Sequence, residues 1–151
     1  IDEDVKSVWI KIEDRKPYTI LASSLSGSNR DDKTKTLRLN LSYVSPAGSI
    51  AGSRRFREQW KKYVIQTLSG ELQNRKILAE LNFEERSRRF IGTLYRSVKT
   101  KNGERAQDVN LWMVQQGLSF YFIDRGKSPK DKDYLKAQQM ARKSKKGVWH
   151  Y

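Results

Sequence analysis

The 151-residue chain predicts one α+β domain, because segments with the alternating pattern of β-strands come first and segments with helical spacing dominate the end. Apolar residues make up 36% of the chain and aromatic residues 11%, which is enough for one hydrophobic core. Three prolines and nine glycines are too few for a low-complexity or disordered chain. We expect an acidic tail over residues 1–5, followed by a single domain over residues 6–151.

Three strands are predicted in the first third of the chain. Residues 7–12 alternate between apolar and polar side chains, and residues 18–22 form a second apolar run. Residues 36–43 place three leucines on one face of a third strand. A turn at residues 14–17 and a polar loop over residues 23–35 connect these strands.

A helix and two further strands follow. After a loop rich in Ser, Gly and Pro at residues 45–53, large apolar side chains recur at spacings of three and four over residues 54–68. This pattern predicts an amphipathic helix that ends near Gly70. Apolar runs predict strands over residues 76–81 and 90–98.

Two helices are predicted near the C-terminus. The first covers residues 106–116, with Gly117 as its C-cap. A short hydrophobic strand over residues 118–123 separates it from the second helix. The second helix begins at Ser128, a capping residue followed by a proline, and continues to about residue 146.

The residue types present exclude several kinds of chemistry. The chain has no cysteine and a single histidine, His150, next to the C-terminus. Disulfides, thiolate nucleophiles, histidine-based triads and two-histidine zinc sites are therefore excluded. Catalysis would have to use carboxylates, arginines, hydroxyls or an oxygen-ligated metal ion.

No apolar run of the sequence approaches the ~20 residues of a membrane span, and the chain does not open with the pattern of a signal peptide. The chain begins at Ile1 rather than Met, so we expect it to be a piece of a longer protein. We expect an intracellular location, and the sequence leaves the compartment open.

The 31 Lys and Arg residues outnumber the 17 Asp and Glu residues, which gives a formal net charge of +14 at pH 7. Residues 125–151 hold half of this excess, and the helix predicted over residues 54–68 carries a second basic cluster. Two basic helices on a small domain predict a surface that binds a polyanion. Nucleic acid is the favoured partner, while acidic lipids, an acidic protein and a merely solubilising role remain alternatives.

Four segments of the chain resemble motifs of one known family. Residues 109–118 are VNLWMVQQGL, which resembles the V-N-x-x-L-V-x-x-G-L helix of the staphylococcal nuclease (thermonuclease) family. Residues 141–149 are ARKSKKGVW and resemble the closing basic helix and terminal G-[IV]-W of that family. Residues 36–41, TLRLNL, and residues 89–95, RFIGTLY, resemble the strands that carry its two catalytic arginines. The resemblance, which extends over residues 36–149, implies a five-stranded OB-type β-barrel with three α-helices.

The resemblance also implies an activity, calcium-dependent phosphodiester hydrolysis, in which carboxylates hold the ion and two arginines stabilise the charge that develops on the phosphate. Arg38 and Arg89 match the two arginine positions. Tyr43, however, stands where the family has an aspartate, and Ala47 follows Pro46 where the family has Pro-Glu. The resemblance therefore implies a retained pair of phosphate-binding arginines without the matching metal carboxylates.

Four other carboxylates are candidates for a displaced metal site. Asp31 and Asp32 lie in the predicted hairpin loop, and Glu84 and Glu85 lie among arginines. Each pair has a simpler interpretation, as solvated loop residues or as ion-pair partners of neighbouring arginines. A hard cation needs several oxygen ligands that converge, so we expect no metal site and no cofactor. Calcium or another divalent ion is expected only if the domain is an active nuclease.

We therefore predict a catalytically lapsed, nuclease-like module that binds nucleic acid, RNA in preference to DNA, within a larger RNA-processing or ribonucleoprotein assembly that supplies protein partners. Tyr43 is the predicted base-stacking residue, because it stands at an active-site position of the family. The predicted phosphate-binding residues are Arg38, Arg54, Arg55, Arg57, Arg88, Arg89, Lys143, Lys145 and Lys146.

Two alternatives remain open from the sequence. The first is an active metal-dependent phosphodiesterase or endonuclease with a divergent carboxylate site, in which Arg38 and Arg89 are catalytic. The second is a scaffold domain whose groove binds a protein partner. The salt dependence of oligonucleotide binding and a cleavage assay distinguish the three hypotheses.

Overall fold

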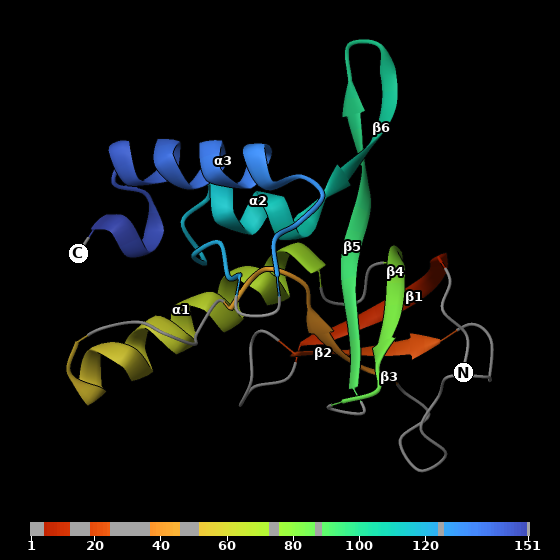
Figure 1. Cartoon of the computed structure of the whole chain (residues 1–151), viewed down its shortest axis with the longest axis horizontal. Coiled ribbons are helices and arrows are strands. Elements are labelled where there is room, and N and C mark those ends of the chain that lie inside the picture. Colours follow the sequence, from red (N-terminus) through yellow and green to blue (C-terminus); the bar gives the residue numbers. More distant parts are fainter. Residues whose placement is uncertain are drawn as a thin grey trace.

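Six β-strands, three α-helices and one short 3-10 helix make up the described part of the computed structural model (Figure 1). The structure describes residues 5–12, 19–24, 37–45, 52–72, 76–86, 89–123 and 126–150, so the predicted acidic tail lies outside it except for Val5. The elements, in chain order, are β1 (Val5–Ile12), β2 (Thr19–Ser24), β3 (Leu37–Leu41), α1 (Arg54–Leu72), β4 (Lys76–Glu84), β5 (Arg89–Thr100), β6 (Gly103–Asp108), α2 (Val109–Gln115), α3 (Asp131–Lys143) and the 3-10 helix η1 (Gly147–His150).

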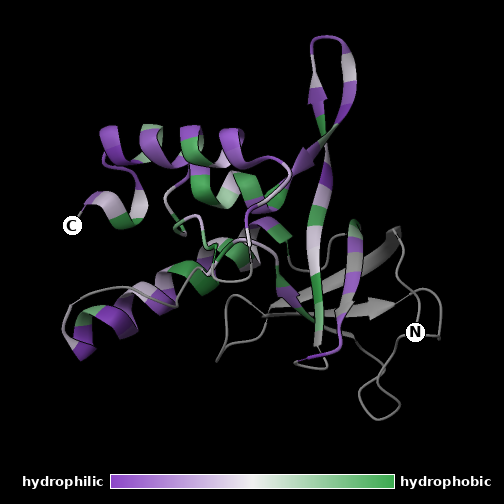
Figure 2. Cartoon of the chain, in the orientation of Figure 1, coloured by the Kyte–Doolittle hydropathy of each residue, from purple (hydrophilic) through white to green (hydrophobic). Residues whose placement is uncertain are grey.

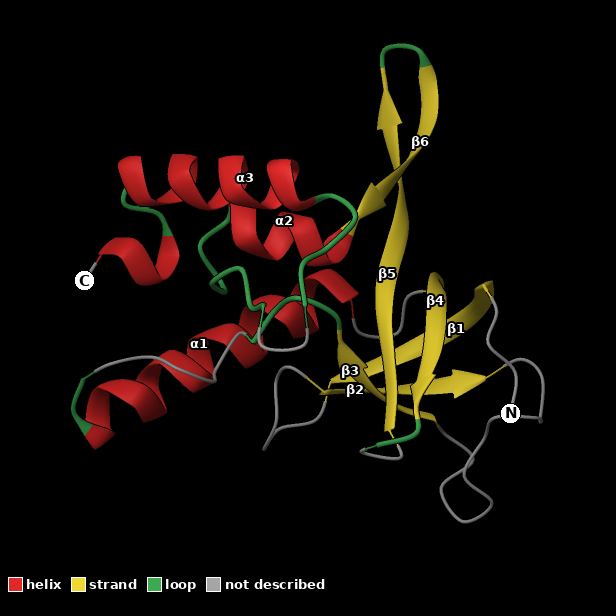
Figure 3. Cartoon of the chain, viewed as in Figure 1, coloured by secondary structure: helices red, strands yellow, loops and turns green. Residues whose placement is uncertain are grey.

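Five of the strands have the arrangement of an OB-type barrel. Neighbouring strands pair in the order β3-β2-β1-β4-β5, and a parallel pairing between β3 and β5 joins the last of these strands to the first. Leu39 and Leu41 of β3 are 0% and 5% exposed, as expected for alternate residues on the inner face of a barrel. Figure 3 shows the strands gathered on one side of the molecule and the helices on the other. These observations confirm the predicted α+β, OB-type fold.

The sixth strand forms a hairpin with β5 that projects beyond the barrel (Figure 1). The sequence predicts a helix from residue 106, but the chain up to Asp108 belongs to β6, and α2 begins at Val109. That boundary is wrong because the backbone of β6 pairs with the outer half of β5. Asp108 then caps α2, since its Oδ1 accepts a 2.9 Å hydrogen bond from the N–H of Leu111.

Two further boundaries differ from the predicted ones. The helix predicted to end near Gly70 continues to Leu72, because Leu68 and Leu72 are both 0% exposed in the core. Burial of a leucine outweighs the cost of about 1 kcal/mol for glycine inside a helix. The strand predicted over residues 118–123 is reduced to a single bridge between Tyr121 and Val44.

The last helix begins at Asp131 rather than at Ser128. Ser128 forms the turn before it, in which the serine Oγ accepts a 2.9 Å hydrogen bond from the N–H of Lys130. The helix ends at Lys143, because Lys145 adopts the left-handed conformation with a φ of 53°. The predicted helix is therefore shorter at both ends.

The helices and the barrel share one apolar core. One face of α1 is buried at spacings of four residues, through Trp60, Val64, Leu68 and Leu72. In Figure 2 the hydrophobic colour concentrates in α2 and along the middle of α1, whereas α3 is mostly hydrophilic. The outer surface of α3 is thus mostly polar and charged, with Leu135 and Met140 as exposed apolar side chains.

Asn110, the asparagine of the motif in residues 109–118, joins α2 to two strands. Its side chain is 0% exposed, and its Oδ1 accepts a 3.2 Å hydrogen bond from the N–H of Leu94. Its Nδ2 donates to the carbonyl of Ser42 at 2.9 Å and to that of Gly92 at 3.1 Å. Because buried amides need partners, this residue type at this position holds α2 in place on β5 and on the segment after β3.

Two motif glycines fix the C-terminal segment. Gly117 and Gly147 have φ values of 68° and 56°, and a Cβ on either would clash with the backbone of the other segment. The close approach allows the N–H of Val148 to donate a 2.8 Å hydrogen bond to the carbonyl of Gly117. The ring of Trp149 packs edge-on against Phe120, with centroids 5.0 Å apart. The chain after α3 is therefore held against the end of α2.

Candidate nucleic-acid interface

Arg38 and Arg89 lie at neighbouring positions of the barrel. In the parallel pairing, Leu39 of β3 is opposite Phe90 of β5, so the two arginines precede a matched pair of residues. Glu84 of β4 is the antiparallel partner of Arg89. The structure describes the backbone of these two arginines and not their side chains. The β3–β5 pairing thus brings together the two positions that the sequence singles out.

Tyr43 belongs to a cluster of three tyrosines. Its ring packs edge-on against Tyr121 and Tyr134, with centroid distances of 6.5 and 5.8 Å. Tyr121 and Tyr134 stack on each other at 4.7 Å. Tyr43 is partly buried and has a φ of 65°, and its carbonyl accepts a 2.8 Å hydrogen bond from the N–H of Phe122. Much of the ring of the predicted base-stacking residue is therefore used in packing.

The other two tyrosines of the cluster, Tyr121 and Tyr134, are buried and contribute to the fold. Burial raises the pKa of Tyr134 well above its ordinary range. Burial also raises the pKa of Tyr121, whose Oη donates to Asp131 at 2.9 Å and accepts from the N–H of Ser128 at 2.8 Å. Both hydroxyls remain protonated at neutral pH, and that of Tyr121 holds the turn before α3 through Asp131 and Ser128.

One lysine of the basic C-terminal segment has a structural partner that the sequence did not indicate. The Nζ of Lys130 lies 3.0 Å from Asp108 Oδ2 and 5.5 Å from the ring centroid of Tyr95. Burial lowers the pKa of Lys130, but the hydrogen bond and charge of Asp108 outweigh it and raise the pKa overall. Lys130 thus contributes to fastening α3 to β6.

The basic cluster at the start of α1 is exposed. Ser53 caps the helix, since its Oγ accepts a 3.2 Å hydrogen bond from the N–H of Phe56. The first turn contains Arg54, Arg55 and Arg57, all exposed, and no acidic residue. A helix N-terminus is the positive end of the helix dipole, so cations there oppose helix stability. These arginines therefore do not stabilise α1, and their exposed side chains can bind an anion.

The second basic cluster lies at the end of α3 and in the turn after it. Lys143, Lys145 and Lys146 are all exposed. The N–H of Lys145 donates to the carbonyl of Arg142 at 3.2 Å, and the N–H of Lys146 to that of Ala141 at 3.0 Å. This pair of hydrogen bonds is the Schellman motif, which turns the chain sharply at the end of a helix. The turn directs the segment after α3 back toward α1.

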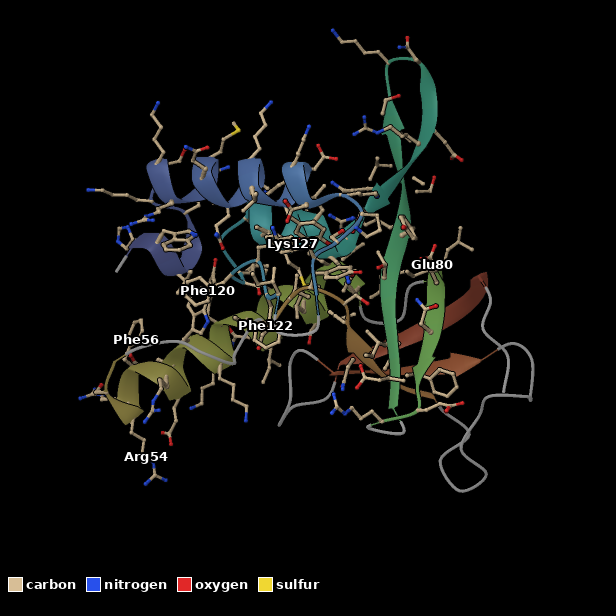
Figure 4. The ribbon with its side chains drawn as sticks, in the orientation of Figure 1. Arg54, Phe56, Glu80, Phe120, Phe122 and Lys127 are labelled. Carbon is tan, nitrogen blue, oxygen red and sulfur yellow. The ribbon has the colours of Figure 1, made fainter. Side chains whose placement is uncertain are left out.

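A pocket of about 400 Å³ lies between α1 and the C-terminal segment, and Lys145 of the second cluster lines it. We call it the basic pocket; its lining includes Phe56, Trp60 and Tyr63 of α1 with Lys145, Gly147 and His150. Figure 4 shows Phe56 extending from α1 on the side of the C-terminal segment and Arg54 extending on the opposite side. The pocket and the exposed arginines therefore both lie at the start of α1, with Arg54 on the side of the helix away from the pocket. Arg88 lies outside the described residues.

The described residues contain no group of three or more His, Cys, Asp or Glu side chains that could hold a metal ion. Of the candidate carboxylates, Glu84 and Glu85 are described, while Asp31 and Asp32 lie outside the described residues, as do Pro46 and Ala47. None of the described helices is long and apolar enough to cross a membrane.

Three comparisons with known proteins bear on this geometry. The family model described as staphylococcal nuclease homologue matches residues 45–151. The chain is similar in structure to the extended Tudor domain of Drosophila melanogaster Tudor-SN (p100), with a TM-score of 0.56 and 16% sequence identity. The similarity covers 99% of this chain and 75% of that one, so it includes the three strands before residue 45. Comparison with curated protein sequences finds no match.

Proposed function

The chain belongs to the staphylococcal nuclease homologue family, and we propose that this member is a nucleic-acid-binding module, with RNA preferred to DNA, in which catalysis has lapsed. The observation that carries the proposal is the pair of exposed basic clusters, one at the start of α1 and one at the end of α3, on the two segments that line one pocket. Closely spaced cations release the counterions of a phosphate backbone when they bind it, and this release drives association without sequence preference.

The environment of Tyr43 supports binding rather than hydrolysis. This residue stands where the family has an aspartate, and its ring packs against two other tyrosines. A packed phenol ring does not supply the carboxylate oxygen that a hard cation requires. The adjacent positions of Arg38 and Arg89 in the barrel are compatible with a phosphate-binding role that does not need the ion.

The proposal is tested by measuring the affinity of the purified domain for short fluorescent single-stranded RNA and DNA at salt concentrations from about 50 to 200 mM. We expect log K to fall linearly with log salt. The double variant Arg55→Ala/Arg57→Ala should flatten the slope by about 0.7 for each phosphate that the variant no longer binds. Lys99→Ala/Lys101→Ala removes the same charge from the exposed end of the β5–β6 hairpin and is the matched control.

Binding that is independent of salt, or no binding at low salt, would contradict the proposal. The second outcome would favour the scaffold alternative, for which the half-exposed side chains of Leu135 and Met140 on α3 provide apolar surface. As part of the same proposal, the domain works within a larger RNA-processing or ribonucleoprotein assembly. Co-purification of nucleic acid and proteins with the full-length protein checks this point.

One observation favours a residual nuclease as the second candidate. The paired positions of Arg38 and Arg89, with Glu84 opposite Arg89, place two arginines and one glutamate on adjacent strands. Incubation with single-stranded RNA and DNA in calcium, magnesium or manganese decides between the two candidates. Cleavage that Arg38→Ala or Arg89→Ala abolishes would replace lapsed catalysis by an active enzyme.

A further inference from the structure

The basic pocket contains an aromatic surface in addition to its cations. Phe56, Trp60 and Tyr63 occupy one face of α1, and the rings of Trp60 and Tyr63 lie 5.5 Å apart with a tilt of 34° between their planes. Trp60 is 5% exposed and belongs to the core, whereas Tyr63 is 50% exposed. The buried indole thus supports a tyrosine ring that is open to the pocket.

Lys145 provides a second and independent observation. It occupies the position after the α3 C-cap with a φ of 53°, in the left-handed region where helices commonly place glycine. A lysine there is less favourable for the backbone than glycine would be. Its exposed side chain lines the basic pocket. A cation is therefore kept beside the aromatic rings at a position where the fold alone would favour glycine.

We propose that the basic pocket is a base-stacking site, in which one unpaired base of a nucleic-acid strand lies against Tyr63 while Lys145 contacts a flanking phosphate. The inference rests on the proposed function and adds a contact to the base. The volume of about 400 Å³ is toward the lower end of the roughly 300–1,000 Å³ typical of small-ligand sites, which suits a single base. Every base has a stacking face, so the site tolerates any sequence but requires a single strand.

The charge of the region identifies the occupant. Over residues 54–62, five Lys or Arg residues accompany one acidic residue, Glu58, and the described lining of the pocket contains no carboxylate. A nucleic-acid strand repeats a negative charge beside each base, which matches cations placed next to an aromatic ring. A protein side chain that entered the pocket would satisfy the rings without requiring the surrounding charge.

The test compares a short oligothymidine with an abasic strand of the same length, which keeps the phosphates and lacks the bases. Tyr63→Ala should weaken binding of the base-carrying strand about tenfold and leave the abasic strand within about twofold. Tyr63→Phe retains the ring and should bind both strands as the unmodified protein does. Leu135→Ala, a residue of the same 50% exposure on α3, is the matched control for loss of surface area.

Lys145→Gly separates the role of the charge from that of the backbone. We expect lower affinity for both strands together with a higher midpoint of thermal unfolding, because glycine suits the left-handed conformation. Lys146→Ala removes a neighbouring charge outside that conformation, and should not raise the midpoint. A variant Lys145→Gly that binds both strands normally would overturn the role of Lys145 in the site.

Photo-cross-linking of the unmodified protein provides a measurement that does not depend on folding of a variant. A strand carrying 5-iodouracil should cross-link to the α1 peptide that contains Phe56 and Tyr63. Cross-links confined to the barrel, or an equal effect of Tyr63→Ala on both strands, would overturn the base-stacking site and leave the proposed function intact. If neither strand binds, the proposed function fails and this inference fails with it.

Discussion

The charged residues of the barrel and those around the basic pocket differ in what they contact. In the barrel, Arg96 Nη1 lies 2.6 Å from Glu71 Oε2, and its Nε donates to Gln107 Oε1 at 2.6 Å. Its guanidinium carbon also lies 4.6 Å from the ring centroid of Trp112. Through these three partners, Arg96 contributes to holding α1, α2 and the β5–β6 hairpin together.

Around the basic pocket the charged side chains form a weak ion pair or are exposed to solvent. The ion pair between Arg54 and Glu58 spans 3.2 Å, but its side chains are 88% and 62% exposed, so it contributes little to stability. Arg55, Arg57 and Lys145 are exposed as well. The difference shows that the net charge of +14 has two uses: some cations stabilise the fold, and those near the pocket are available to a ligand.

The largest expected effect concerns the buried amide that joins α2 to the barrel. Asn110→Ala leaves the N–H of Leu94 and the carbonyls of Ser42 and Gly92 without this partner, so we expect the free energy of unfolding to fall by about 3 kcal/mol. Urea denaturation measures it, with the exposed Asn102→Ala as control. Affinity of the folded fraction for nucleic acid should be unchanged. A selective loss of affinity would contradict the assignment of Asn110 to the fold and not to the interface.

The tyrosine cluster predicts a dependence of stability on alkaline pH. Burial raises the pKa of Tyr134 above its ordinary 10.0, so the unfolded chain loses this proton at a lower pH than the folded protein. The stabilisation is complete below about pH 10 and is lost as pH rises further, by up to about 1.4 kcal/mol per pH unit. Urea denaturation between about pH 9 and pH 11 should show this loss, and Tyr134→Phe should reduce it. A constant stability over that range would contradict the assignment of Tyr134 to the core.

The next largest expected effect on stability concerns Arg96 of β5. Arg96→Met removes the interactions with Glu71 and Gln107, and we expect the free energy of unfolding to fall by about 1.5 kcal/mol. Arg105→Met, at an exposed position of β6, is the matched control for the loss of one charge. Oligonucleotide affinity should change equally little in both variants. A large loss of affinity for Arg96→Met alone would place the barrel arginine at the interface.

The smallest effect has the opposite sign. Arg55→Ala removes a cation from the positive end of the α1 dipole, so the free energy of unfolding should rise by about 0.5 kcal/mol while affinity for nucleic acid falls. Thermal unfolding and binding of one preparation measure both quantities. Lys62→Ala, further along α1 and also exposed, should leave stability unchanged. A fall in stability for Arg55→Ala would show that this cation supports the fold.

The pattern of the sequence predicted most elements of the fold, because amphipathic spacing records locally which side of an element is buried. The errors lie where a distant segment decides the structure. Residues 106–108 have no local feature that excludes a helix, and they form a strand because β5 is long enough to pair with them. Residues 118–123 are apolar enough for a strand, but their pairing is limited to one bridge, between Tyr121 and Val44.

The sequence by itself determined the family, the excess of positive charge and the two basic clusters, since residue types and short motifs carry this information. Only the tertiary structure decided that Tyr63 and Lys145, more than eighty positions apart, line one pocket. It also decided that Lys130, another cation of the C-terminal segment, forms an ion pair with Asp108. The physical reason is the packing of the core, in which the contact between Gly117 and Gly147 returns the end of the chain toward α1. No local pattern of charge or hydrophobicity encodes such a contact.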